Sequence, residues 1–131
     1  MMSKSNFYIA LIITVLLFNA CKEKVITPQD KISRNWKYTE MKLGDDQFPA
    51  SRLGYPTMEF RVDSTYTVNI NDLAEDGSWF ITGDTLFTTS SSDMSQKMQI
   101  NLLTMDSMVL EGISQDIPMI LIMVADTTKK R

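Results

Sequence analysis

The strongest constraint on the fold of this chain is a two-residue alternation of apolar and polar side chains. In "TYTVNI" the apolar Tyr66, Val68 and Ile70 alternate with polar residues, and "KMQINL" repeats the pattern. Such a period is typical of strands with one buried face. Turn-forming clusters such as "EDG", "TGDT" and "TMDS" separate these runs at short intervals. We therefore predict about eight strands, at residues 35–43, 57–62, 66–71, 77–82, 85–90, 96–103, 108–113 and 118–125.

The loop lengths predict how neighbouring strands pair, because each loop fixes the register of its hairpin. The predicted pairs are Phe80–Phe87 and Ile81–Leu86 around loop 83–84, Val62–Tyr66 around loop 63–65, and Ile100–Leu110 and Leu102–Met108 around loop 103–107. Sequential hairpins that share one apolar face form an up-and-down antiparallel meander. Closure of such a meander into a barrel or half-barrel would protect its edge strands.

The N-terminus has the pattern of a secretory signal peptide. A short polar start that contains Lys4 precedes an apolar run over residues 7–18, and the small Ala20 follows. An apolar run of this length is too short to cross a bilayer core of roughly 30 Å as a helix. We therefore expect residues 1–20 to be a signal peptide, followed by a polar tether at 21–31, a β domain at 32–126 and a basic tail at 127–131.

The only cysteine of the chain, Cys21, lies where the signal peptide is expected to end. The stretch "FNAC" resembles the lipobox of bacterial lipoproteins, which implies that Cys21 is lipidated and anchors the mature chain to a membrane. Several acyl chains anchor a protein far more stably than one. The "KE" after the cysteine resembles signals that direct lipoproteins to the outer face of the outer membrane, and a charged, solvated tether explains the same residues.

Four segments of the β domain together resemble the small lipocalin-like lipoproteins of Gram-negative bacteria. These are Ile32 to Trp36, "MEFRVDSTYTV", "GSWFITGDTL" and "INLLTMDSMVLEG". The chain departs from the pattern at Arg34 and Asn35, where Gly would precede the Trp, and at Ser64, where the pattern has a turn Gly. The resemblance implies a lipocalin-like barrel, anchored in the bacterial outer membrane and facing either the periplasm or the cell surface.

A lipocalin-like barrel suggests non-catalytic binding of a small hydrophobic ligand in its interior. The inward-facing residues predicted to line such a cavity are Trp36, Tyr38, Phe60, Tyr66, Val68, Trp79, Ile81, Leu86, Met98, Ile100, Met108 and Leu110. The alternative is that these side chains fill the interior completely, since eight-stranded barrels can be packed solid.

A second hypothesis is that the domain docks a protein partner on its outer surface. If Trp79 faces inward, the pair Phe80 and Phe87 faces outward, and the last strand, "IPMILIMVA", is apolar on both faces. The predicted patch is Phe80, Phe87, Met119, Leu121 and Met123. The alternative is that the loop at residues 44–57 or the tether covers these residues.

Composition argues against several other classes of function. The chain has no histidine to activate a nucleophile, and Glu40, Glu59 and Glu111 are expected to be solvated charges. The acidic residues around Asp45 and in "NDLAEDG" do not have the spacing of a calcium loop. A net charge of −3 without a basic patch argues against nucleic acid. We thus expect no enzyme, no cofactor and no metal site.

Overall fold

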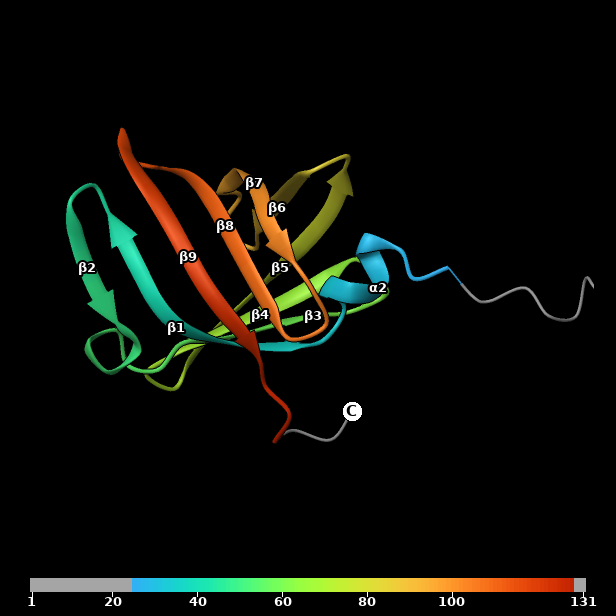
Figure 1. Ribbon diagram of the computed structural model, residues 1–131, viewed down its shortest axis with the longest axis horizontal. Helices are drawn as coiled ribbons and strands as arrows, with labels where there is room; N and C mark the ends of the chain where they lie inside the picture. Colours follow the sequence, from blue (N-terminus) through green and yellow to red (C-terminus); the bar gives the residue numbers. More distant parts are fainter. Residues whose placement is uncertain (1–24, 129–131) are drawn as a thin grey trace, which may run out of the picture.

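The computed structural model describes residues 25–128, and within them almost every regular element is a strand. The strands are β1 (Asn35–Leu43), β2 (Asp46–Pro49), β3 (Thr57–Phe60), β4 (Thr65–Ile70), β5 (Leu73–Thr82), β6 (Thr85–Ser90), β7 (Ser95–Leu103), β8 (Ser107–Ser114) and β9 (Ile117–Ala125). They form one antiparallel sheet in the order β2-β1-β3-β4-β5-β6-β7-β8-β9, and β9 also pairs with β1. This pairing closes all strands except β2 into a barrel of eight (Figure 1). The predicted all-β, up-and-down barrel is confirmed.

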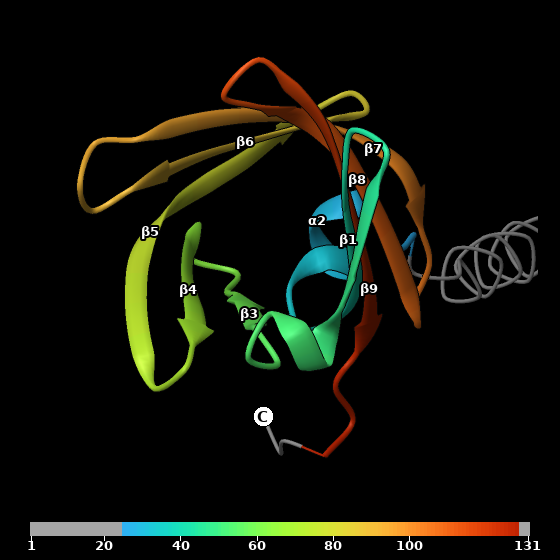
Figure 2. The same cartoon turned by 90° about the vertical axis from the view of Figure 1, so that its left-hand side faces the viewer.

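The two ends of the barrel differ. At the closed end lie the short helix α2 (Pro28–Ile32) and the turns at residues 61–64, 83–84 and 104–106. The turns at residues 44–45, 71–72, 91–94 and 115–116 surround the opposite end, which we call the mouth. Figure 2 shows the barrel from the mouth, with α2 on the far side.

Helix α2 falls in the segment predicted to be an irregular tether, so the tether prediction for residues 28–31 is wrong. The Thr27 hydroxyl accepts a hydrogen bond from the Asp30 amide at 3.2 Å, and the Asp30 carboxylate accepts one from the Thr27 amide at 3.1 Å. Pro28 occupies the first turn, where its missing N–H costs nothing. This capping box starts the helix, and fully buried Ile32 at its end anchors it to the barrel core.

The predicted β5–β6 register is confirmed, with Phe80 opposite Phe87 and Ile81 opposite Leu86. In the β3–β4 hairpin the three-residue loop spans residues 62–64 instead of 63–65, so that Tyr66 lies opposite Phe60 and not Val62.

The cause of this shift lies in the turn itself. Ser64 adopts the left-handed conformation, with φ 69°, that a three-residue hairpin loop requires at its last position. The Asp63 carboxylate accepts hydrogen bonds from the Thr65 hydroxyl and from the Thr65 amide, and both lower the pKa of Asp63. Ser64 thus takes the place at which the resembled family has glycine.

Two further differences concern β7 and β2. Ile100 lies opposite Leu110 as predicted, but an irregularity between Ile100 and Leu102 places Leu103, not Leu102, opposite Met108. The expected long loop at residues 44–57 contains β2 and the 3-10 helix η1 (Ala50–Arg52). Strand β2 pairs with the second half of β1, residues 40–43. The sequence "DQFP" is too short and too polar to show the alternation of a strand.

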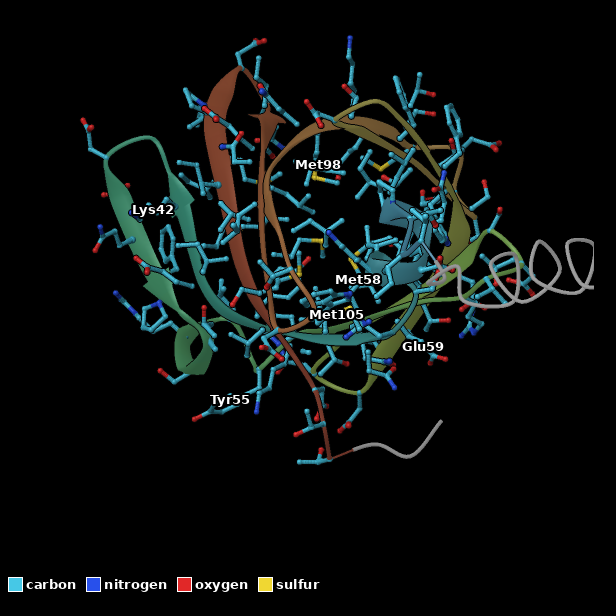
Figure 3. The ribbon with its side chains drawn as sticks, turned by 45° about the vertical axis from the view of Figure 1, so that its right-hand side comes forward. Lys42, Tyr55, Met58, Glu59, Met98 and Met105 are labelled. Atoms are coloured by element: carbon cyan, nitrogen blue, oxygen red, sulfur yellow. The ribbon has the colours of Figure 1, made fainter. Side chains whose placement is uncertain are left out.

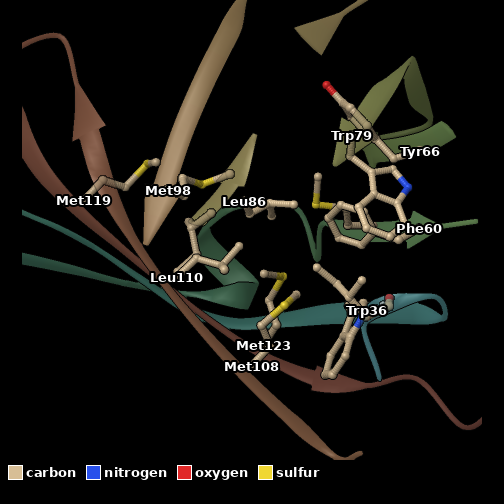
Figure 4. Close-up of a cluster of buried hydrophobic side chains, with 13 residues drawn as sticks. Trp36, Phe60, Tyr66, Trp79, Leu86, Met98, Met108, Leu110, Met119 and Met123 are labelled. Atoms are coloured by element: carbon tan, nitrogen blue, oxygen red, sulfur yellow. Dashed lines mark hydrogen bonds between the residues drawn. The ribbon is translucent and has the colours of Figure 1, made fainter. Parts of the chain in front are cut away.

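The interior at the closed end is a solid apolar core. Trp36 and Phe60 are almost fully buried, and the ring of Phe60 meets that of Trp79 edge-on at 5.4 Å (Figure 4). The Trp36 indole donates a hydrogen bond to the Ile32 carbonyl at 2.9 Å. The Trp79 indole donates to the carbonyls of Arg61 and Thr65 at 3.1 and 3.0 Å. Both indoles therefore bind backbone groups of the segments that close this end.

Candidate functional site

All twelve residues predicted to line a ligand cavity face the barrel interior. Eight are buried, namely Trp36, Phe60, Tyr66, Trp79, Leu86, Met98, Met108 and Leu110, and four pack against them partly buried, namely Tyr38, Val68, Ile81 and Ile100. Tyr38, Tyr66, Val68 and Met98 line a pocket toward the mouth, whereas the other eight belong to the packed core, in which Trp79 and Ile81 also border a separate pocket beside α2. The two alternatives left open by the sequence, a cavity and a solid interior, thus apply to different parts of one barrel.

The pocket occupies the interior toward the mouth and has a volume of about 220 Å³. Its lining comprises Tyr38, Met58, Tyr66, Val68, Glu75, Thr88, Ser90, Met94, Gln96, Met98 and Leu121. Figure 3 shows Met58 and Met98 pointing into the barrel, and Glu59 on its outside. Since a cavity of roughly 150 Å³ holds one benzene molecule, this space suits a guest of about ten non-hydrogen atoms.

The polar part of this lining is not among the residues predicted from the sequence. Glu75, Thr88, Ser90 and Gln96 come from β5, β6 and the start of β7. They could have been found by extending the inward rows of side chains toward the mouth, because every second residue of a strand faces the same side. Along β5, Glu75 is four residues before inward-facing Trp79 and therefore faces the same side. The row that starts at Leu86 in β6 leads to Thr88 and Ser90.

Gly77 lies in the same inward row and makes room for Tyr66. A Cβ atom at Gly77 would lie 2.6 Å from two atoms of the Tyr66 ring and would also meet the Thr89 carbonyl. The missing side chain lets the ring lie against the backbone of β5. In this position the Tyr66 hydroxyl forms a hydrogen bond with Thr88 and interacts electrostatically with Glu75.

Both pocket tyrosines are held in their neutral form. Burial raises the pKa of Tyr38 to about 12, and the nearby Tyr66 adds to this shift. Burial also raises the pKa of Tyr66, and the negative charge of Glu75 acts in the same direction, against a hydrogen bond from Thr88 that lowers it. The two phenol groups can therefore donate or accept hydrogen bonds at neutral pH without adding charge to the pocket.

Glu75 is the charged residue of the lining. Its carboxylate accepts a hydrogen bond from the Ser92 hydroxyl at 2.9 Å, which ties the start of β5 to the turn after β6. No lysine or arginine is among the residues that line the pocket.

A wider groove on the outside of β6, β7 and β8 has a volume of about 740 Å³ but is shallow and open to solvent. It is lined mainly by polar and charged side chains, including Asp84, Lys97 and Glu111. A groove of this kind encloses little of a small ligand, so the interior pocket is the better candidate site.

The predicted outer patch is partly wrong. Phe80 and Phe87 stack outside the barrel, with ring centroids 4.7 Å apart, and Phe80 is 56% exposed. Met119, Leu121 and Met123 instead face the interior and are at most 7% exposed. Their direction is set by the pairing of β9 with β1 and β8, in which Met123 lies opposite Met108 and Tyr38. A partner-docking role thereby loses most of the surface expected to serve it.

Other predicted features have no counterpart in the described structure or lie outside it. Within residues 25–128, acidic side chains form no group that could hold a metal ion, and no helix has the length and apolarity needed to span a bilayer. Cys21, the signal peptide at 1–20 and the end of the basic tail lie outside the described residues.

No protein-family model matches the chain, and no curated protein matches its sequence. The function of the protein is therefore inferred from the geometry of the barrel and from the residues of its pocket.

Proposed function

We propose that this protein is a membrane-anchored lipoprotein of the lipocalin-like type, which binds a small, largely hydrophobic molecule without chemical conversion. The observation that carries the proposal is the pocket of about 220 Å³ at the mouth, which combines the apolar side chains of Met58, Met98 and Leu121 with a few polar groups. Ligand sites in proteins commonly have this composition. Thioether side chains are flexible and adapt to the shape of a guest.

Binding without catalysis is the function best matched by the lining. Apart from the two neutral tyrosines, Glu75 is its one ionisable side chain. General acid–base catalysis by carboxylates usually needs a second acidic group, and the chain has no histidine to serve instead.

The test compares the native and denatured masses of the mature chain, residues 21–131 with Cys21→Ser, purified from a bacterial host without detergent. We expect a mass difference that corresponds to a small guest, and extraction would identify that guest. The variant Ser90→Trp should fill the pocket and abolish the difference, because Ser90 lines it.

Thr89→Trp is the matched control, because Thr89 lies next to Ser90 but is exposed on the outer face of β6. Equal native and denatured masses, together with no binding of any added small lipophile, would contradict the proposed function. Retention of the guest in Ser90→Trp would indicate that the pocket is not where the guest binds.

The proposed lipid anchor has a separate test. The wild-type precursor should yield a mature chain that begins at Cys21, carries fatty acyl groups and sediments with the outer membrane. Cys21→Ser should remove the acyl mass and release the chain from the membrane fraction. An unmodified Cys21 in membrane-bound protein would contradict lipidation, while leaving the binding function intact.

A further inference from the structure

The walls of the mouth pocket differ in chemistry. Glu75, Thr88, Ser90 and Gln96 form a polar wall on β5, β6 and the start of β7. Met58, Val68 and Leu121, on β3, β4 and β9, form an apolar wall that adjoins the polar wall where β4 pairs with β5 and Val68 lies opposite Glu75. Tyr38 on β1 and Tyr66 on β4 add their phenol groups to the lining. A guest that fits this pocket has a hydrocarbon body and one polar group.

The charge of the lining indicates the sign of that polar group. Glu75 is part of the inward row of β5 and contributes a carboxylate, whereas no basic side chain lines the pocket. A carboxylate or phosphate group on the guest would meet Glu75 without a compensating cation. A protonated amine would form an ion pair with Glu75, and the neutral Tyr66 hydroxyl next to it can accept a further hydrogen bond.

The turns around the mouth carry charge of the same sign. Each of the four mouth turns contains an exposed aspartate, namely Asp45, Asp72, Asp93 and Asp116. Three of them have positive φ angles, so their local role is to form tight turns. Together they nevertheless create a negative potential at the opening, which concentrates cations there.

The basic residues near this end do not cancel the effect inside the pocket. Lys42 lies in β1, between Gln47 of β2 and Ile120 of β9, and Arg52 is exposed in η1. Lys97 of β7 lies over the ring of Phe87, outside the barrel. None of these three residues contributes to the pocket lining.

We propose that the mouth pocket selects small amphipathic amines, with the protonated amine at Glu75 and the hydrocarbon body against the wall that contains Met58 and Leu121. This inference rests on the proposed binding function and names its ligand class. The volume of about 220 Å³ limits such a guest to roughly the size of one aromatic ring with a short side chain.

The test uses three probes of nearly equal size that share one phenyl ring, namely phenethylamine, phenethyl alcohol and phenylacetate. Each is titrated into the isotope-labelled mature chain with Cys21→Ser, and dissociation constants are taken from amide chemical shifts. We expect the amine to bind about two- to fivefold more tightly than the alcohol, because an ion pair with the exposed Glu75 contributes a modest free energy. The alcohol should in turn bind more tightly than the acid.

The variant Glu75→Gln removes the charge and keeps the size of the side chain. It should bring the affinity for the amine down to that for the alcohol, with the affinity for the alcohol unchanged. Glu111→Gln is the matched control, because Glu111 is exposed, hydrogen-bonded to Asn101 and absent from the pocket lining. The control should preserve the order of the three probes.

The possible failures are distinguishable. Equal binding of the three probes, or tighter binding of the acid, would overturn the amine inference and leave the binding function standing. Retention of the amine preference in Glu75→Gln would overturn the assignment of Glu75. Absence of binding by every probe and of any guest in the native mass spectrum would contradict the proposed function itself.

Discussion

The closed half and the mouth half of the barrel are built from the same strands, yet their interiors differ. Along β5 the inward row runs from Trp79, in the packed core, to Glu75, in the pocket. Along β6 it runs from fully buried Leu86 to Ser90. One strand can thus stabilise the fold with one end and line a pocket with the other, and a departure from the rules of core packing is the pattern expected of a candidate binding site.

If the closed half carries most of the stability, truncation there should have the largest effect. Trp36→Ala removes a fully buried indole and should lower the free energy of unfolding by about 3–5 kcal/mol. Val68→Ala, in the lining of the pocket, should cost no more than about 1.5 kcal/mol. Urea denaturation of the mature chain measures both values.

Comparable losses in the two variants would contradict the division into a packed half and a hollow half. If Trp36→Ala does not fold, the milder Trp36→Phe keeps the comparison measurable. It should still cost more than Val68→Ala, since it breaks the hydrogen bond between the indole and the Ile32 carbonyl.

Alkaline pH should act on the mouth half. The pKa of Tyr38 is about 12 in the folded protein and about 10 in the unfolded chain, so the folded state retains the phenol proton at higher pH. The folded protein therefore has this stabilisation in full below pH 10 and loses it as the pH rises to about 12. The loss amounts to about 2–3 kcal/mol, and the raised pKa of Tyr66 acts in the same direction.

Urea denaturation at a series of pH values between 9 and 12 (roughly the range of phenol titration) measures this dependence. Tyr38→Phe removes the phenol and should flatten the curve. An unchanged curve in this variant would show that Tyr38 is not the group responsible.

A smaller effect is expected from Gly77→Ala, which adds one methyl group where the Tyr66 ring approaches β5. It should lower the free energy of unfolding by about 1–3 kcal/mol through overpacking and should displace the ring from the polar wall. Wild-type stability would show that the strand or the ring can move freely there. Gly83→Ala is a useful contrast: its added Cβ would meet no atom, so any loss would come from its positive φ of 59° alone.

The sequence predicted the barrel because alternation and turn residues are local signals. The capping box at Thr27 and Asp30 is equally local and could have predicted α2. The inward direction of Met119, Leu121 and Met123 could not be predicted, because "IPMILIMVA" has no alternation and only pairing with β1 and β8 sets its faces. The irregularity after Ile100 likewise depends on contacts between strands, which the nearby turn residues do not specify.

The pocket is an intermediate case. Its polar wall can be predicted because every second residue from inward-facing Trp79 and Leu86 also faces inward. The sequence therefore contains the signal for Glu75, Thr88 and Ser90. What the sequence does not contain is the boundary between the packed and hollow halves. That boundary depends on how much of the barrel volume the side chains fill, which Gly77 and the ring of Tyr66 help to decide.

The position of α2 at the closed end has a consequence for how an anchored molecule would be oriented. Thr27, which caps this helix, follows Cys21 by six residues, a span of at most about 21 Å. A lipid on Cys21 would therefore hold the closed end toward the bilayer and direct the opening away from it. The guest would then enter from the surrounding aqueous phase, and a partner that delivers or collects it would approach from the side opposite the membrane.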